Sequence, residues 1–333
     1  MVFKRLLGSL GVGAPTVDTV LDPGPVLPGG ELSGQVHLRG GSSGFDIEHV
    51  TLDLMARVEA EHEDGESEGA VTFERFTVGG GFRLAADEQR SVPFSVTLPW
   101  ETPVTELYGQ DLGIVLGVRT GLSVAGAKDK GDLDPLAVRP LPAQEAILEA
   151  LGQLGFGFRS ADLELGRIGG TGQQLPFYQE IELSPGPGYA GSVNEIELTF
   201  LAHAGGMDVV LEADKRGGAF SGGHDAVSRF TVRHDGVAHQ DWNAQVDGWL
   251  RQLVEHRESF GAHASYGHGD PYPAGSGHSS GPGIGTAVAV GAAGLAVGVV
   301  GGMVAAEVVD EVGDFFEDDE GEDEGEGDDE GDE

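Results

Sequence analysis

Residues 50–58 read VTLDLMARV, and the alternation within them indicates the fold class. Every second side chain is apolar; these positions are Val50, Leu52, Leu54, Ala56 and Val58. The positions between them are mostly polar: Thr51, Asp53, Met55 and Arg57. Because successive side chains of a β-strand point to opposite faces, this alternation predicts a half-buried strand of an antiparallel sheet.

The same period of two recurs on both sides of this stretch. Residues 31–39 and 91–98 alternate in the same way, and further strands are predicted at 71–78 and 112–124. Glycine- and proline-rich turn signals separate them, at 28–30, 40–44, 79–81 and 99–103. Many short strands divided by such turns predict a β-sandwich.

A second unit is predicted after a charged, turn-rich segment at 128–135, which is interpreted as an interdomain linker. Apolar residues recur at helical spacing over 143–154, which predicts an amphipathic helix. Strands are predicted near 156–165, 177–183, 193–201, 208–213 and 228–234. Asp241 is a suitable cap for a helix whose apolar stripe contains Trp242 and Trp249, interpreted as core residues.

The composition excludes some classes of function. The chain of 333 residues has a net charge of −37, and residues 307–333 hold 17 acidic side chains with no Lys or Arg. Nucleic-acid binding is therefore not expected, because it depends on Lys and Arg neutralising phosphates. The chain has no Cys, which excludes disulfides and thiolate metal sites and fits the predicted cytoplasmic location.

Several stretches together resemble one known family. They are 2–7 (VFKRLL), 17–19 (VDT), 27–34 (LPGGELSG), 92–99 (VPFSVTLP) with Pro103, 179–183 (QEIEL) and 209–214 (VVLEAD). In order and spacing they look like the bacterial sporulation-control (SpoOM) family, over roughly residues 1–256. The resemblance implies two arrestin-like β-sandwiches and a role in controlling sporulation. It implies no catalytic residue.

The predicted fold is therefore all-β, with two arrestin-like β-sandwich domains in tandem and a few short helices. The predicted divisions follow the chain: an N-terminal amphipathic helix at 1–15, the first sandwich at 16–130, the second with flanking helices at 131–256, a flexible Gly/Ser/His linker at 257–283, an apolar glycine-repeat segment with an amphipathic helix at 284–316, and a disordered acidic tail at 317–333.

Motifs for catalysis and cofactor binding are missing from the sequence. There is no Walker loop, G-x-S-x-G elbow, dinucleotide fingerprint or H-E-x-x-H helix. No catalytic residue, cofactor or metal site is predicted. Four histidines, His256, His263, His268 and His278, share one stretch, but their spacing matches no structural metal site. They are interpreted as part of a solvated linker.

The C-terminal segment carries the sharpest candidate site. Gly294, Gly298 and Gly302 repeat every fourth residue, which on a helix forms one face for close helix packing. Residues 284–306 hold no charge and as a helix would reach roughly 34 Å, enough to span a bilayer core. Two alternatives stay open: insertion in a membrane, or a hinge or helix packed within the protein or its oligomer. A second apolar stripe predicts a partner-docking helix: Val308, Val309, Val312, Phe315 and Phe316.

The first functional hypothesis is a cytoplasmic, arrestin-like regulator of sporulation that acts as a scaffold by binding protein partners. Its C-terminal segment would set self-association or membrane proximity. The second is a membrane-anchored structural protein of the envelope or the cell-division machinery. A third class, an enzyme or a carbohydrate-binding sandwich, would need an aromatic-lined or carboxylate-paired cleft. Protein partners of unknown identity are expected, together with membrane contact through residues 284–306 or self-association.

Overall fold

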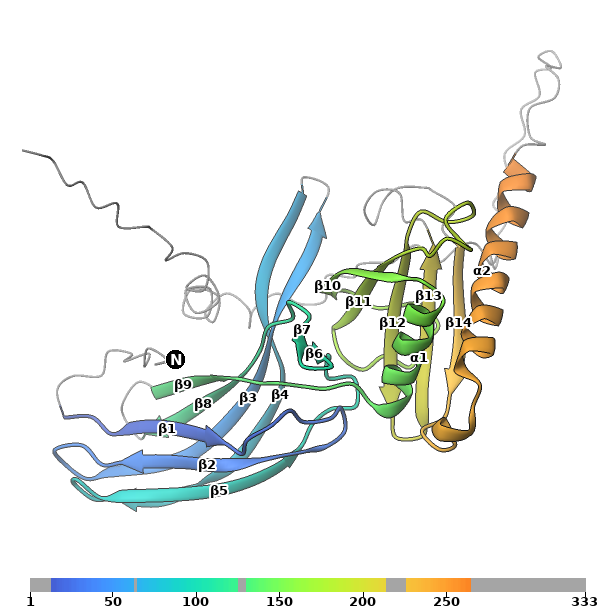
Figure 1. The fold of residues 1–333 in the computed structure, drawn as a ribbon. Helices are drawn as coiled ribbons and strands as arrows, with labels where there is room; N and C mark the ends of the chain where they lie inside the picture. Colours follow the sequence, from blue (N-terminus) through green and yellow to red (C-terminus); the bar gives the residue numbers. More distant parts are fainter. Residues whose placement is uncertain (1–12, 63–64, 125–129, 214–225, 265–333) are drawn as a thin grey trace, which may run out of the picture.

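The computed structural model describes residues 13–62, 65–124, 130–213 and 226–264. These residues form two β-rich units in tandem, each with its own hydrophobic core (Figure 1). The mostly β fold class predicted from the sequence is confirmed, although the second unit holds one sheet covered by helices and not the predicted two-sheet sandwich. Residues 1–12 of the predicted N-terminal helix lie outside the described residues. The predicted acidic tail at 317–333 lies wholly outside them.

The first unit packs two sheets against each other. One sheet has the order β1–β2–β5, formed by Thr16–Leu21, Glu31–Arg39 and Gln89–Thr97. The other contains β4–β3–β8–β9, formed by Gly65–Leu84, Phe45–His62, Leu116–Val124 and Lys130–Pro135. The alternation at 50–58 is realised in β3, whose apolar positions face the core, while the intervening side chains lie on the opposite face of the sheet, where Asp53 and Met55 are also buried. Its partners β4 and β8 both run antiparallel to it.

One predicted feature of this unit is wrong. The segment 128–135, interpreted as a linker, contains β9, which pairs with β8 through the register Gly117↔Pro135 to Leu122↔Lys130. Leu136 and Val138 beyond it are buried in the first core. The charged residues of β9 alternate with others along the strand, and the turn-like composition concealed this two-residue period. The strand predicted at 112–124 is shorter, because Gly113 has a φ of +83° and the strand begins only at Leu116.

The β3–β4 hairpin connects the two units. Only the first part of β3, up to Ala56, pairs with β8, and the rest continues beyond the sandwich with β4 alone. In Figure 1 this extension rises beside β10 (Gly157–Leu165). Glu59 of β3 pairs there in parallel with Glu164 of β10. The second sheet of the first unit is therefore continuous with the sheet of the second unit.

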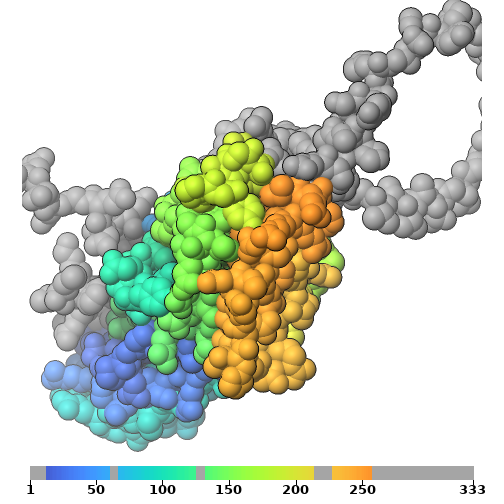
Figure 2. Space-filling model, turned by 45° about the vertical axis from the view of Figure 1, so that its right-hand side comes forward, coloured from blue at the N-terminus to red at the C-terminus, as the bar shows by residue number. Residues whose placement is uncertain are grey.

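The second unit is an antiparallel sheet with helices on one face. Its strand order is β10–β11–β12–β13–β14, with the last four at Phe177–Ser184, Ile196–His203, Gly206–Ala213 and Ala226–Val232. The flanking helices α1 (Pro142–Gln153) and α2 (Trp242–Ala264) cover the face that presents Ile181, Leu198 and Leu211. Figure 2 shows α2, in orange, along the outside of this unit.

Both helices begin where the sequence predicted. Pro142 occupies the first turn of α1, and the side chain of Gln144 accepts a hydrogen bond from the backbone N–H of Leu141 at 2.8 Å. The Asp241 carboxylate caps α2 by accepting from the Ala244 N–H at 3.1 Å. Trp249 is buried in the second core, as predicted. Because α2 continues to Ala264, the linker predicted to begin at 257 is wrong for its first residues.

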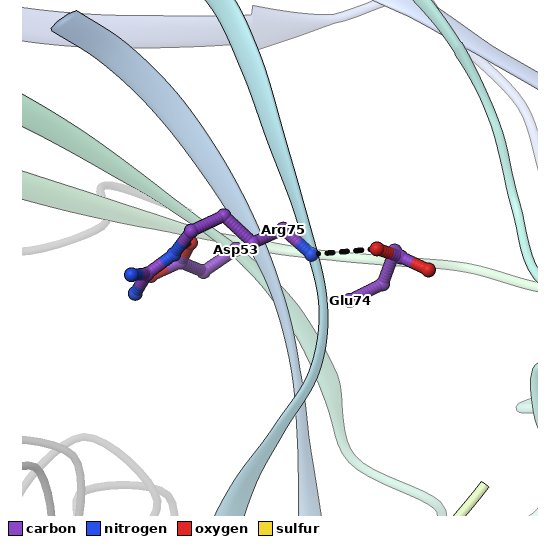
Figure 3. A network of polar contacts seen from close by, with 3 residues as sticks. All are labelled: Asp53, Glu74 and Arg75. Carbon is purple, nitrogen blue, oxygen red and sulfur yellow. Dashed lines mark hydrogen bonds and ion pairs between the residues drawn. The ribbon is translucent and has the colours of Figure 1, made fainter. Parts of the chain in front are cut away.

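A carboxylate is almost fully buried on the outer face of the first unit. Asp53 of β3 lies opposite Arg75 of β4, and its side chain is 5% exposed whereas that of Arg75 is 65% exposed. The guanidinium lies against the carboxylate (Figure 3) and donates two hydrogen bonds to it, from Nε at 2.6 Å and Nη2 at 2.7 Å. Glu74 accepts from the Arg75 backbone N–H at 3.0 Å. The Asp53–Arg75 pair thus joins β3 to β4 by side chains in the middle of the hairpin that connects the units.

A second carboxylate points between the two sheets, at the β1–β9 edge. Asp134 is half-buried and its Oδ2 is buried without a hydrogen-bond partner among the described residues. Burial, together with the charges of Asp132 and Asp18, raises the pKa of Asp134 to about 7. The nearby Asp132 carboxylate accepts a hydrogen bond from the Thr19 N–H at 2.9 Å. The ionised form of Asp134 is therefore unfavourable in the folded protein.

This predicts a stability that falls as pH rises. The folded protein holds the Asp134 proton up to about pH 7, whereas the unfolded chain releases it near its ordinary pKa of 3.8. The free energy of unfolding should then decrease between about pH 4 and pH 7, and Asp134→Asn should remove about 1–2 kcal/mol of that decrease after allowance for solvent screening. Urea unfolding at pH 5 and pH 8 measures it. Equal pH dependence in Asp134→Asn and in the exposed control Asp22→Asn would contradict the prediction.

Candidate binding site

The loop 99–105 joins the two units by side-chain contacts. Trp100 stacks on His234 with ring centroids 5.0 Å apart and packs against the second core. The amide of Gln179 on β11 bonds both backbone groups of Val104, accepting from its N–H at 2.9 Å and donating to its C=O at 2.8 Å. The carboxylate of Glu101 accepts from the backbone N–H groups of Gln174 and Leu175 at 2.8 Å. These bonds fix the second unit against the first.

A pocket of about 320 Å³ lies on this junction. The β1–β2 loop, the short β6–β7 hairpin (Glu106–Leu107 and Gln110–Asp111), the connection into α1, and α1 itself form its walls. Its lining residues are Pro25, Leu27, Glu106, Tyr108, Gly109, Arg139, Pro140, Pro142 and Glu145. In Figure 2 the teal of the hairpin lies beside the green of α1. The volume is at the small end of the range for ligand pockets and suits a single side chain or a short peptide segment.

Backbone hydrogen bonds make the floor of the pocket rigid. Val26 pairs in parallel with Val138: its N–H donates to Ala137 at 3.0 Å, and its C=O accepts from Arg139 at 2.9 Å. On the other side of Val138, the Thr105 N–H donates to the Val138 carbonyl at 2.9 Å, and the Thr105 hydroxyl accepts from the Val138 N–H at 2.8 Å. Three chain segments are thus tied together under the pocket, which is largely preformed.

Tyr108 is an outlier at the rim of this pocket. It has a φ of +53° and Gly109 a φ of +74°, which together form a type I′ turn between β6 and β7. Asn, Asp or Gly normally occupy the first of these positions, because a larger side chain clashes with the backbone there. Among the described residues Asp87 is the other non-glycine with positive φ, and Asp tolerates it. Tyr108 is also 61% exposed, so core packing does not explain it.

The charges at the pocket are mixed, with an acidic excess. Glu106 and Glu145 line it together with Arg139, and Glu149 lies one turn further along α1. Partial burial raises the pKa of Tyr108, and the charges of Glu145 and Glu149 raise it further. The Tyr108 phenol therefore stays protonated at neutral pH and lies in a negative local potential. A rigid wall of prolines, an aromatic ring and these carboxylates together can bind a side chain with an apolar stem and a polar end.

Three carboxylates also gather on the outer face of the second sheet. Asp162, Glu164 and Glu180 have oxygens within 4.8 Å of one another, and the register pairs Asp162 directly with Glu180. Each already has an interaction partner in the folded chain. These residues belong to an acidic face that also carries Glu182, Glu197 and Glu212 in directly opposite positions on β11, β12 and β13.

The site residues predicted from sequence fall mostly beyond the described chain. Gly294, Gly298, Gly302 and the stripe from Val308 to Phe316 lie outside it, so both remain predictions. Among the described residues, no helix is long and apolar enough to cross a membrane, and residues 284–306 are not among them. His256 lies on α2 with its Nδ1 3.4 Å from the Ser228 hydroxyl. The side chains of His263, His268 and His278 are not described.

Comparison with known proteins shows to which family the chain belongs. The family model described as SpoOM protein matches residues 3–217. The chain belongs to the SpoOM family. The sporulation-control protein Spo0M of Bacillus subtilis (strain 168) is 37% identical over 215 residues, which are 64% of this chain and 81% of that protein. The crystal structure of Spo0M from Bacillus subtilis matches with a TM-score of 0.59 and 29% identity, covering 76% of this chain and 99% of that one.

The SpoOM match confirms the resemblance seen in the sequence and contains the whole pocket. All lining residues, from Pro25 to Glu145, fall within residues 3–217. The pocket itself was missed by sequence reasoning. Gly109 is a local turn signal, but Tyr108 before it is not a usual turn residue, so the local sequence indicates the hairpin only weakly. Its position beside Pro140, Pro142 and Glu145 depends on tertiary packing, and no local pattern records that.

Proposed function

We propose that this SpoOM-family chain acts in the control of sporulation as a non-catalytic scaffold, and that it binds protein partners through the Tyr108 pocket at the junction of its two units. The Bacillus subtilis relative is described by sporulation control rather than by a reaction. The exposed, conformationally strained Tyr108 carries the proposal. The positive φ of Tyr108 does not help the protein fold, since Asn would form the same turn more easily. We infer that the tyrosine is kept there because its exposed ring binds a partner.

The rigid setting of the pocket supports this role. Its floor is tied by backbone bonds and its two sides belong to different units, so a bound partner would contact both units at once. Preformed sites bind with less loss of conformational freedom than flexible ones. Large exposed aromatic residues are also the side chains that most often dominate protein–protein binding energy.

Complementation tests the proposal. The chain would be expressed in a Bacillus subtilis strain lacking its own Spo0M, as wild type, as Tyr108→Asn, and as the control Asp87→Asn at the other positive-φ position. Heat-resistant spores are counted and folded protein is quantified in each strain. Wild type and Asp87→Asn should restore spore counts, whereas Tyr108→Asn, which weakens an anchor contact by roughly tenfold or more, should not.

Each other outcome overturns a defined part of the proposal. Failure of folded wild-type chain to restore sporulation would contradict the sporulation role of this chain. Restoration by Tyr108→Asn as complete as by wild type would show that partner binding does not use this pocket.

A further inference from the structure

The pocket at Tyr108 has the shape and chemistry to select one class of partner group. Two of its walls are proline rings, Pro25 and Pro140, which offer apolar surface without backbone donors. The Tyr108 ring lies at its rim, on the hairpin that stands beside α1. An extended aliphatic stem packs well against such walls, and a polar end would then lie among the charged lining residues.

The sign of the lining charge distinguishes a basic from an acidic ligand. Glu106 approaches from β6 and Glu145 from α1, against the single cation Arg139. Glu149, the next acid on α1, adds to the negative potential felt at the Tyr108 phenol. The chain as a whole has a net charge of −37, so its long-range field attracts basic partners and repels acidic ones.

We propose that the pocket binds a lysine or arginine side chain of a basic partner segment, with the stem against Pro25 and Pro140 and the cation held by Glu106, Glu145 and the face of Tyr108. Cations bind over tyrosine faces, and a carboxylate beside the same cation adds a charge-assisted hydrogen bond. Because the positive charge of Arg139 offsets one of the two carboxylates, the pocket retains negative charge for a single bound cation. This inference rests on the proposed function, because it names the chemistry of the partner that the pocket would receive.

The probe is a capped pentapeptide, acetyl-Gly-Pro-Lys-Pro-Gly-amide, compared with the same peptide carrying acetyl-lysine. Each is titrated into the full-length, ¹⁵N-labelled chain, and the amide signals of Tyr108 and Gly109 report occupancy of this pocket and not of the acidic tail. The lysine peptide should shift both signals, and the acetyl-lysine peptide should bind at least about threefold more weakly.

Matched variants assign the contacts. Glu106→Gln and Glu145→Gln should each weaken binding of the lysine peptide by roughly threefold. Glu68→Gln removes the same charge from the β3–β4 hairpin, away from the pocket-lining residues, and should leave the affinity within about 1.5-fold of wild type. Tyr108→Asn should abolish the shift at Gly109 while the remaining spectrum stays folded.

Equal binding of the two peptides would overturn the proposal in favour of a neutral, proline-type ligand. Absence of shifts at Tyr108 and Gly109, or equal effects of Glu106→Gln and Glu68→Gln, would overturn it as well. These results are distinguishable from failure of the proposed function: a sporulation defect of Tyr108→Asn without lysine-peptide binding keeps the pocket as a partner site and rejects only the basic partner.

Discussion

Arg75→Ala should destabilise the protein by about 2–3 kcal/mol, although the arginine side chain is 65% exposed. The loss comes from its partner. Asp53 is 5% exposed and would lose both charge-assisted hydrogen bonds while staying buried. Arg119 occupies the register position opposite Asp53 on β8, so the expected loss is smaller than for a fully isolated buried charge. Chemical denaturation in urea measures the difference from wild type.

Arg83→Ala is the matched control on the same hairpin. Arg83 donates from Nη1 to both carboxylate oxygens of Asp46 at 3.0 and 3.1 Å, and both side chains are 64% exposed. An ion pair in solvent contributes about 0–1 kcal/mol, so this variant should unfold nearly like wild type. If the two variants lose equal stability, burial of Asp53 does not determine the strength of its pair.

The regular elements were predictable because their signal is local. In β2 the period of two survives along the whole strand, and in β3 the core positions keep it over residues 50–58, so the core face of both stretches follows directly from sequence. The first turns of α1 and α2 carry Gln144 and Asp241, which satisfy free backbone N–H groups in any context. Elements of this kind need no knowledge of their neighbours.

The wrong linker prediction at 128–135 and the missed connection between the two units have a common physical cause. Residues 130–135 hold three charged side chains, one glycine and one proline, yet they form β9 because β8 offers a free edge and Asp132 can bond the backbone of Thr19. Tertiary pairing there overrides weak local propensity. The parallel contact between Glu59 and Glu164, which makes one sheet of two, joins residues more than a hundred positions apart. No periodicity within either strand encodes it.

The binding pocket was hidden for the same reason. Its lining comes from three separate stretches, around residues 25–27, 106–109 and 139–145. Each stretch alone is an ordinary turn or helix start. What distinguishes Tyr108 is its backbone conformation, which only the folded hairpin reveals. From the sequence, the acidic excess of the composition argued only against nucleic-acid binding; the basic ligand follows from the residues that line the pocket.

Gly29→Ala should have the other large effect, about 3 kcal/mol of lost stability with a displaced Trp100. Gly29 is the third residue of a type II turn, with a φ of +68°, and the turn closes through the Gly30 N–H bonding the Leu27 carbonyl at 2.8 Å. A Cβ on Gly29 would lie 2.4 Å from the Trp100 ring. The backbone penalty of about 1 kcal/mol is thus joined by an overpacking cost of about 2 kcal/mol.

Gly24→Ala separates these two costs. Gly24 also has a positive φ, +102°, but a Cβ there would contact nothing within 4 Å, so only the backbone penalty of about 1 kcal/mol applies. Urea unfolding gives both losses, and the summed emission of the three tryptophans, Trp100 among them, should shift to longer wavelength in Gly29→Ala alone. Equal losses of stability in the two variants would show that the Trp100 ring moves aside without an energetic cost. A larger loss in Gly29→Ala would mean that the Leu27 turn holds Trp100 against the second core, beside the pocket that Leu27 helps to line.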